Sequence, residues 1–147
     1  VYEVGDSKAP FTIQSVSKAF VFALALEMLG ADQVEEFVGV EPSGEAFNSI
    51  RLNAKNQPFN PMVNAGAIAC SGLIYKVKGA GAFEAIHDML CRFAGRKLAV
   101  DEAVHASESA TGDRNRAIGW MLRAESGWTG RRPIGWPEAA ATTITGE

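Results

Sequence analysis

The stretch Gln14-Ser15-Val16-Ser17-Lys18-Ala19-Phe20 stands at the entrance to the most apolar segment of the chain. Apolar residues recur there at helical spacing, so the sequence predicts a helix from Ser15 to Leu29 that stops at Gly30. The residues of this apolar stripe are Phe20, Ala23, Leu24 and Met28. Positions three residues apart share a face of a helix, so we expect Ser15 and Lys18 side by side in its first turn.

A serine and a lysine in this arrangement can act as a nucleophile and its base. The serine hydroxyl is a weak nucleophile until a neighbouring base removes its proton. Lysine can do so only as a neutral amine, so its pKa must fall from an ordinary value of about 10.4. Burial beneath Phe20 and Phe22 and the positive end of the helix dipole both lower that pKa. The free backbone N–H groups of the first turn can hold an oxyanion.

The same two residues also have a purely structural interpretation. Ser15 is then the N-cap of the helix, and Lys18 is a surface residue of its first turn. A lysine at this position opposes the helix dipole, and this misfit favours the catalytic interpretation.

Composition limits the classes of function. The chain has 147 residues, 47% of them apolar and 21% charged, which suits a single globular domain. The net charge of -3 predicts no nucleic-acid partner, and the segment from Ala19 to Leu29 is too short to cross a membrane and carries Glu27. Cys70 and Cys91 make no disulfide framework, so we expect a reducing compartment, the cytoplasm.

The rest of the chain is predicted to be mainly helical, with a long polar loop from Glu41 to Asn64. Further helices are expected over 32–37 with Asp32 as its cap, over 65–75 and 82–93, over 101–110 with Asp101 as its cap, and over 113–123 after an interruption at Thr111-Gly112. Short strands are expected over 1–4, 11–13 and 50–52. The segment from Glu125 to Glu147 shows no period and is expected to be poorly ordered.

Four motifs follow one another along the chain. They are Gln14-Ser15-Val16-Ser17-Lys18, then Val38-Gly39-Val40-Glu41-Pro42-Ser43-Gly44 with Phe47-Asn48-Ser49, then Asn60-Pro61-Met62-Val63-Asn64-Ala65-Gly66-Ala67-Ile68, and last Ser107-Glu108 with Thr111-Gly112-Asp113-Arg114-Asn115. Together they resemble the serine-dependent glutaminases, which share the fold of serine β-lactamases and penicillin-binding proteins. The resemblance runs from about Tyr2 to Leu122. It implies an α+β fold, present here mainly as its helical part with a few strands, in a partial domain over 1–124 followed by an unrelated tail over 125–147.

The resemblance implies hydrolysis of L-glutamine to L-glutamate and ammonia. Ser15 resembles the nucleophile of the family and Lys18 its base, while Asn64, Glu108 and Asn115 fall on positions that hold the substrate. Glu108 suits the α-ammonium of glutamine, and the two asparagine amides suit its α-carboxylate. From the residues alone, Asn64 is equally well a helix N-cap, Glu108 a solvated carboxylate and Asn115 part of a polar turn.

The reaction that the resemblance implies needs no cofactor and no metal. His87 and Cys91 lie four residues apart and have metal-ligating side chains, but no further ligands accompany them in the sequence. The expected partner is the small molecule L-glutamine, and the intact family member is expected to form a homo-oligomer, a homotetramer.

The sequence departs from the family pattern at its ends. The family continues past residue 147 and before Val1, and its later part supplies tyrosines and a backbone N–H for the oxyanion. Tyr2 and Tyr75, the two tyrosines of the chain, match none of those positions, and His105 stands where a tyrosine is expected. We therefore expect a truncated fragment with exposed apolar faces and weak or no activity.

Two other functions stay open on the sequence. A penicillin-recognising serine enzyme shares the S-x-x-K motif, but the chain has no S-x-N, Y-x-N or K-T-G motif of that class. The other is a non-catalytic helical fragment that binds a partner through exposed apolar faces.

Overall fold

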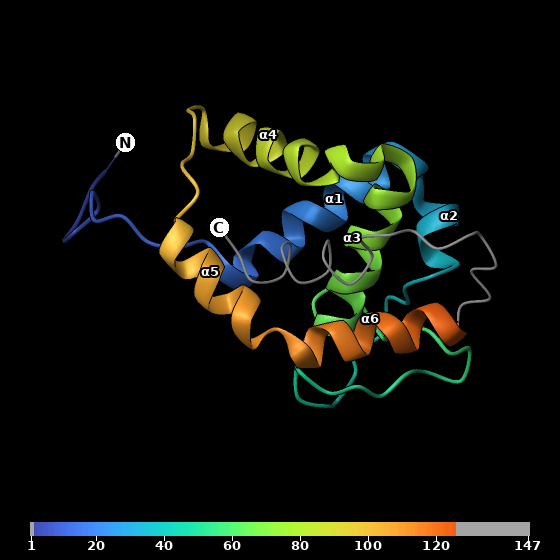
Figure 1. The fold of residues 1–147 in the computed structure, drawn as a ribbon. Helices are drawn as coiled ribbons and strands as arrows, with labels where there is room; N and C mark the ends of the chain where they lie inside the picture. Colours follow the sequence, from blue (N-terminus) through green and yellow to red (C-terminus); the bar gives the residue numbers. More distant parts are fainter. Residues whose placement is uncertain (1, 126–147) are drawn as a thin grey trace.

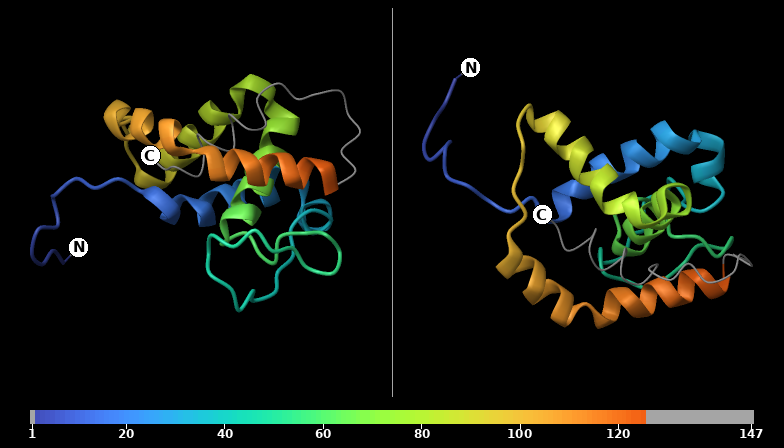
Figure 2. Two further views of the ribbon diagram at one scale, coloured as in Figure 1. Left: turned by 60° about the horizontal axis from the view of Figure 1, so that its bottom comes forward. Right: turned by 45° about the horizontal axis from the view of Figure 1, so that its top comes forward.

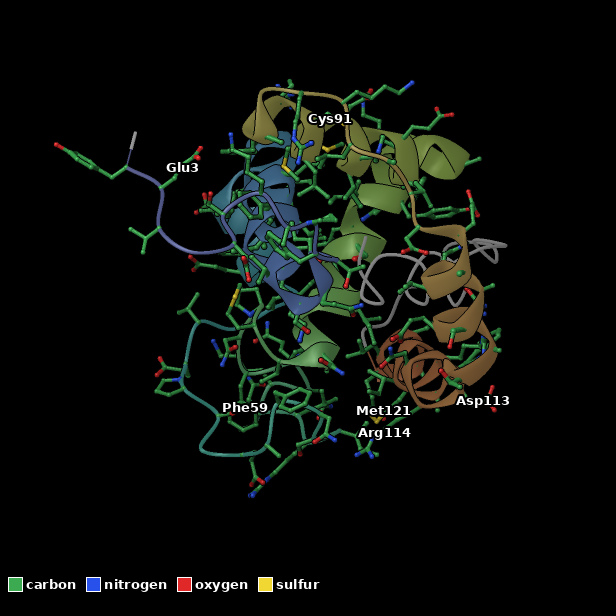
Figure 3. All side chains as sticks on the ribbon, turned by 90° about the vertical axis from the view of Figure 1, so that its left-hand side faces the viewer. Glu3, Phe59, Cys91, Asp113, Arg114 and Met121 are labelled. Atoms are coloured by element: carbon green, nitrogen blue, oxygen red, sulfur yellow. The ribbon has the colours of Figure 1, made fainter. Side chains whose placement is uncertain are left out.

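The computed structural model describes residues 2–125 and folds most of them into a bundle of helices (Figure 1). The elements are the 3₁₀ helices η1 (Gln14–Val16) and η2 (Gly79–Gly81) and the α-helices α1 (Ser17–Leu29), α2 (Ala31–Glu35), α3 (Asn64–Lys78), α4 (Ala82–Ala94), α5 (Glu102–Thr111) and α6 (Asp113–Glu125). The segment before η1 extends away from the bundle and carries Glu3 (Figure 3). The sequence predicts poor order over 125–147, but Glu125 is the last residue of α6. The rest of that segment, 126–147, lies outside the described residues, as does Val1.

Helix α3 is the centre of the bundle. Its residues 65–74 are all buried, because α1, α4 and α6 pack around it (Figure 1). Small residues such as Gly66 and Ala69 let neighbouring chain segments approach closely, while Ile68 fills space between the helices. This central helix carries Asn64 at its first position.

Helix α1 turns one face toward α3. Val21, Leu24 and Ala25 form the buried part of that face. Lys18 belongs to the same face, since it lies three residues before Val21 and seven before Ala25. The helix ends at Gly30, whose φ of 83° is left-handed and favours glycine. The fold therefore carries a lysine side chain toward the core.

Helix α4 has almost the limits that the sequence predicts. Ile86 and Met89 are buried on its inner face, and the left-handed Gly95 ends the helix with a φ of 63°. Phe93 packs edge-on against Phe20 of α1, with the two ring centroids 5.0 Å apart. Contact between these rings joins α4 to α1.

Asp101 begins α5 as the sequence predicts. Its carboxylate accepts the backbone N–H groups of Ala103 and Val104, each at 3.1 Å, and so satisfies two free donors at the start of the helix. The helix itself has no buried residue. The cap fixes where the helix begins, and the junction with α6 joins its other end to the bundle.

Helix α6 continues from α5 after a bend at Gly112, and the two form one arc along the edge of the bundle (Figure 2). Arg116 spans the bend, because its guanidinium donates to the carbonyl of Ser109 and, at 2.9 Å, to the carboxylate of Asp113. Ile118 is fully buried and packs α6 against α3. The bend thus places the first turn of α6 near the start of the central helix.

The long loop between α2 and α3 lies below the start of α3 in Figure 1. Its two arms are joined where the N–H of Glu41 donates to the carbonyl of Phe59 at 2.9 Å. Arg114, at the start of α6, reaches this loop and donates to the carbonyl of Asn48 at 2.9 Å (Figure 3). The loop is therefore fixed to the bundle from the side of α6.

The mainly helical architecture is confirmed, but the expected strands are wrong. Residues 2–4, 11–13 and 50–52 form neither helix nor strand, and no strand occurs anywhere within residues 2–125. A strand is stable only beside another strand that accepts and donates its backbone hydrogen bonds. Phe11 is 84% exposed and Ile50 is 48% exposed, so these apolar stretches do not enter the core either.

The short helix α2 also differs from the prediction. It begins directly after Gly30 and ends at Glu35, so Asp32 lies inside its first turn and does not cap it. The chain needs no separate cap here, because Gly30 both ends α1 and precedes α2.

Candidate active site

The turn that leads into α1 presents Ser15 to solvent. Ser15 lies in η1, one turn before α1 proper, and its side chain is exposed. Among the described residues its hydroxyl has no hydrogen-bond partner, whereas the hydroxyl of Ser17 donates to the carbonyl of Gln14 at 2.8 Å. Gln14 has a φ of 44°, a left-handed conformation that costs a non-glycine residue on the order of 1–3 kcal/mol. Strain of this kind is typical of functional turns, and here it precedes a free hydroxyl.

Lys18 is buried, as the catalytic interpretation requires. Only 4% of its surface is exposed, although it is a lysine. Its Nζ donates to Oδ1 of Asn64 at 2.6 Å and to the carbonyl of Met62 at 3.2 Å, and it lies 5.7 Å from the ring centroid of Phe47. No carboxylate lies within 4.0 Å of this nitrogen in residues 2–125. The loop and α3 thus meet α1 at one amine, and they surround it with neutral groups.

The number of acceptors around Nζ suits a neutral amine. A neutral lysine amine has two hydrogens and one lone pair, and an ammonium has three hydrogens and no lone pair. Met62 and Asn64 supply two acceptors, which are enough for both hydrogens of the neutral form. The lone pair of Lys18 is then available to a proton from another group.

Burial lowers the pKa of the Lys18 amine from its ordinary value of 10.5. The two acceptors favour the ammonium and act in the opposite direction, but desolvation is the dominant cause. A lowered pKa is what a lysine needs in order to serve as a general base near neutral pH.

The lowered pKa of Lys18 predicts how stability depends on pH. Between the lowered pKa of the folded chain and 10.5, the unfolded chain holds the proton and the folded chain does not. The free energy of unfolding contributed by Lys18 therefore rises with pH through this window, by about 1.4 kcal/mol for each unit of difference between the two pKa values. Below the folded pKa the lysine is charged in both states, and its burial cost is present in full.

The variant Lys18→Met removes this titrating group and keeps an apolar side chain of similar length. As the pH rises from neutral toward 10.5, we expect the free energy of unfolding of the original chain to increase relative to that of Lys18→Met. Urea unfolding of both chains across this range measures the difference. A difference that stays constant, or that falls with pH, contradicts a lowered pKa for Lys18.

Asn64 is the partner of Lys18 and does not cap α3. The N-cap of α3 is Val63, and no side chain caps the helix there. Because Oδ1 of Asn64 accepts from Lys18, its Nδ2 points elsewhere, and this donor has no partner among the described residues. The backbone N–H of Asn64 donates to the carbonyl of Phe47 at 2.8 Å, which fixes the residue between the loop and the lysine. The amide thus keeps one donor group without a partner among the described residues, next to the lysine.

No hydrogen bond or ion pair joins Glu108 or Asn115 to Lys18 or Asn64 within residues 2–125. Glu108 lies in the second half of α5 and Asn115 in the first turn of α6, on either side of the bend at Gly112. Both are half-buried, and within residues 2–125 neither side chain has a hydrogen bond or an ion pair. In Figures 1 and 2 α5 lies at the same end of the bundle as the start of α1. Their polar groups therefore have no partner within residues 2–125, and no hydrogen bond or ion pair joins them to Ser15 or Lys18.

His105 also carries an unpartnered polar atom. This residue stands one turn before Glu108 on α5, and its Nε2 is buried without a hydrogen bond to any described residue. It occupies the position at which the sequence pattern leads us to expect a tyrosine.

The backbone of the first turn offers less than the sequence suggests. The N–H of Val16 donates to the carbonyl of Ile13 at 3.1 Å, and the N–H of Ser17 faces the carbonyls of Gln14 and Ser15. These two donors are already used, so neither is free to hold an oxyanion.

Sequence reasoning missed the contributions of Phe47 and Met62 to the site. The Phe47-Asn48-Ser49 stretch was a visible signal, since it belongs to a motif of the resemblance, but nothing in its spacing places a ring over a lysine more than twenty residues away. The carbonyl of Met62 leaves no trace in the sequence, because any residue supplies a carbonyl.

The side chains of His87 and Cys91 contact each other, and both bind the segment that follows α4. Nε2 of His87 lies 3.1 Å from the carbonyl of Leu98, and the N–H of Leu98 donates to Sγ of Cys91 at 3.2 Å. Residues 2–125 contain no group of three or more histidine, cysteine, aspartate or glutamate side chains placed to bind a metal. Within the same residues no helix has the length and apolarity needed to cross a bilayer.

The chain matches the family described as Glutaminase over residues 1–130. It is 75% identical over 123 residues to Glutaminase 2 of Bradyrhizobium diazoefficiens, a match that covers 84% of this chain and 20% of that protein. It is 50% identical over 123 residues to the glutaminase of Microcystis aeruginosa, covering 83% of this chain and 36% of that protein. The chain thus spans between a fifth and a little over a third of the length of these curated relatives.

Solved structures agree with the sequence matches. A probable glutaminase, ybaS, superposes with a TM-score of 0.84 at 32% identity, over 97% of this chain and 47% of that chain. A probable glutaminase of Bacillus subtilis superposes with a TM-score of 0.79 at 31% identity, over 92% of this chain and 44% of that chain. The fold and the Ser15–Lys18 junction place the chain in the serine β-lactamase-like fold class, of which it shows the mainly helical part. The chain belongs to the glutaminase family.

Proposed function

We propose that the protein hydrolyses the side-chain amide of L-glutamine to L-glutamate and ammonia. One observation carries the proposal: a glutaminase-family chain buries the amine of Lys18 against Asn64, three residues after the free hydroxyl of Ser15. A buried lysine without a carboxylate partner is costly, and catalysis gives a reason for it. The curated relatives with 75% and 50% identity are named glutaminases, which supports the same reaction.

In the proposed mechanism Ser15 is the nucleophile and Lys18 the base. The neutral amine of Lys18 takes the proton of Ser15, whose Oγ then bonds to the amide carbon of glutamine. The resulting ammonium returns the proton to the leaving nitrogen, the C–N bond breaks, and ammonia departs from an acyl-enzyme. Water then attacks the ester, giving its proton through Lys18 to the Oγ of Ser15, and glutamate is released.

The proposed substrate pocket holds the two charges of free glutamine. Glu108 pairs with the α-ammonium, and the amides of Asn64 and Asn115 donate to the α-carboxylate. The unpartnered Nδ2 of Asn64 supports this role, as do the unpaired side chains of Glu108 and Asn115 among the described residues. Because neither Glu108 nor Asn115 is bonded to Lys18 among the described residues, the proposal requires that glutamine itself bridge α5, α6 and the lysine. An amide without these charges leaves the polar groups unpaired and is rejected.

Ammonia release separates the proposed function from its alternatives. The chain is incubated in turn with L-glutamine, L-asparagine and a chromogenic β-lactam, and ammonia, glutamate and ring opening are measured. Equal amounts of ammonia and glutamate from L-glutamine support the proposal. Hydrolysis of the β-lactam with glutamine untouched indicates a penicillin-recognising enzyme. No turnover of any of the three, together with capture of a protein partner, indicates the non-catalytic alternative.

We further propose that the protein acts in the cytoplasm, within glutamate biosynthesis, and that it assembles as a homo-oligomer, a homotetramer. The two cysteines support a reducing compartment: both are free, and burial raises the pKa of the Cys70 thiol to about 12. Exposed apolar residues such as Phe93 and Trp120 support a further contact surface. Light scattering on the purified protein tests the assembly.

A further inference from the structure

We propose that Phe47 is a positioning residue for Lys18: its ring face stabilises the lysine ammonium, and its backbone fixes the asparagine that holds the lysine. The catalytic meaning of this inference rests on the proposed function, but its geometry does not. Nothing in the sequence pattern assigns a task to Phe47.

Phe47 contacts both members of the pair of Lys18 and Asn64. The Nζ of Lys18 lies over its ring, 5.7 Å from the centroid, within the distance at which cations and aromatic faces attract. Its carbonyl accepts the backbone N–H of Asn64 at 2.8 Å, and Oδ1 of Asn64 in turn accepts from Lys18 at 2.6 Å. The three residues form a closed set of contacts that joins the loop, α3 and α1.

The groups around Lys18 make the Phe47 ring more important for the charge of the lysine than an aromatic contact usually is. No carboxylate lies within 4.0 Å of Nζ in residues 2–125, and neither α1 nor α3 has an acidic residue in its first turn. Glu45, the nearest acidic residue along the loop, pairs with Arg51 at 2.7 Å, and Arg114 of α6 donates to the carbonyl of Asn48. When Lys18 is protonated, its charge therefore has three neutral groups as its neighbours within residues 2–125, and the negative face of the Phe47 ring is one of them.

The position of the ring is not explained by core packing. Phe47 is 64% exposed, so burial of apolar surface gives little reason for the ring to lie where it does. Its place is set by the backbone bond to Asn64 and by the neighbouring Asn48, which Arg114 holds from α6. When Lys18 takes a proton during the reaction, the ring is already in place to stabilise the new charge.

A series of substitutions at Phe47 tests the contact. The chain is labelled with ¹³C-lysine, and the pKa of Lys18 is read from its ¹³Cε shift in the original protein and in Phe47→Trp, Phe47→Tyr and Phe47→Leu. Leucine keeps an apolar cover but has no ring quadrupole, so we expect the pKa to fall by about half a unit. Tryptophan has the strongest quadrupole and should raise it, and tyrosine should leave it near the original value.

An internal control is available in the same spectra. Lys76 lies over the ring of Phe37, 5.6 Å from its centroid, and its ¹³Cε resonance should be the same in every Phe47 variant. Equal pKa values of Lys18 in the leucine, phenylalanine and tryptophan chains overturn the inference, as does a rise in the leucine chain. If Phe47→Leu fails to fold, the comparison of tryptophan with phenylalanine decides the question, because equal pKa values in these two chains also overturn the inference. The readout needs no turnover, so a chain that releases no ammonia yet shows the graded pKa refutes the proposed function and not the ring contact.

Discussion

Gly66→Ala should lower the free energy of unfolding by roughly 3 kcal/mol or more, because the new methyl group has no room. A Cβ on Gly66 would lie 1.9 Å from the carbonyl oxygen of Asn60, 2.7 Å from its carbonyl carbon and 2.9 Å from Cα of Pro61. All three atoms belong to the backbone, so no side chain can rotate to relieve the clash. Either α3 or the loop beneath it must move.

The position of Gly66 makes the clash harder to accommodate. It lies in the first turn of the central helix, two residues after Asn64. The side chain of Asn60 accepts the N–H groups of Met62 and Val63, at 3.0 Å and 3.2 Å, and so fixes the turn directly before the helix. A shift of either segment also disturbs the contacts of Lys18 with Met62 and Asn64. We therefore expect any Gly66→Ala protein that still folds to lose the buried environment of the lysine.

Urea unfolding followed by circular dichroism measures the effect, with Gly81→Ala as the matched control. A Cβ at Gly81 meets nothing within 4 Å, and its φ of -83° suits alanine. The control should unfold within about 0.5 kcal/mol of the original chain. Similar stability of the two variants contradicts the close approach of the loop to α3.

The helices could be predicted because their signals are local. Asp101 announces the start of α5 and Gly95 the end of α4, and both act through the nearest turn of their own helix. Strands cannot be predicted from local signals in this way. The alternation of apolar and polar residues at 11–13 produces a strand only if another strand lies beside it. The described residues supply no such partner, and these segments stay irregular.

The site shows the same division between local and distant information. The spacing of Ser15 and Lys18 is local, and so is the apolar pattern that predicted the burial of the lysine. The contact of Lys18 with Asn64 joins residues forty-six positions apart, and only the resemblance to a family suggested that both belong to one site. The contact of Lys18 with the Phe47 ring could not be predicted from the sequence, because it depends on the path of a loop that has no periodic pattern.

Resemblance alone also assigned Glu108 and Asn115, and the structure gives them free side chains among the described residues without joining them to Lys18. Among the α-helices of residues 2–125, α5, which carries Glu108, is the one without a buried residue, so fewer core contacts restrain it. The bend held by Arg116 is then the feature that sets where Glu108 lies relative to Asn115. Their role in binding the substrate stays a prediction. Measuring ammonia release from glutamine analogues that lack the α-ammonium or the α-carboxylate tests it.

The largest effect on activity is expected from Ser15→Ala. If Ser15 forms the acyl-enzyme, its removal should lower ammonia release from L-glutamine roughly 10⁴-fold or more, because water must then attack the amide directly. The side chain is exposed and has no hydrogen-bond partner among the described residues, so the free energy of unfolding should change by less than about 0.5 kcal/mol. Loss of activity without loss of stability is the signature of a nucleophile.

Ser17→Ala is the matched control for Ser15→Ala, because it removes the same hydroxyl two residues along the chain. Ser17 is 3% exposed and its hydroxyl donates to the carbonyl of Gln14 at 2.8 Å, so its loss should cost about 1 kcal/mol of stability and less than roughly tenfold in activity. The two variants thus have opposite expectations, stable and inactive for Ser15→Ala, less stable and active for Ser17→Ala. Acid quenching during turnover, followed by mass spectrometry, should find a γ-glutamyl group on the peptide that contains Ser15 in the control and none in Ser15→Ala. Ammonia release that survives Ser15→Ala contradicts the mechanism, since Lys18 then has no proton to take from that residue.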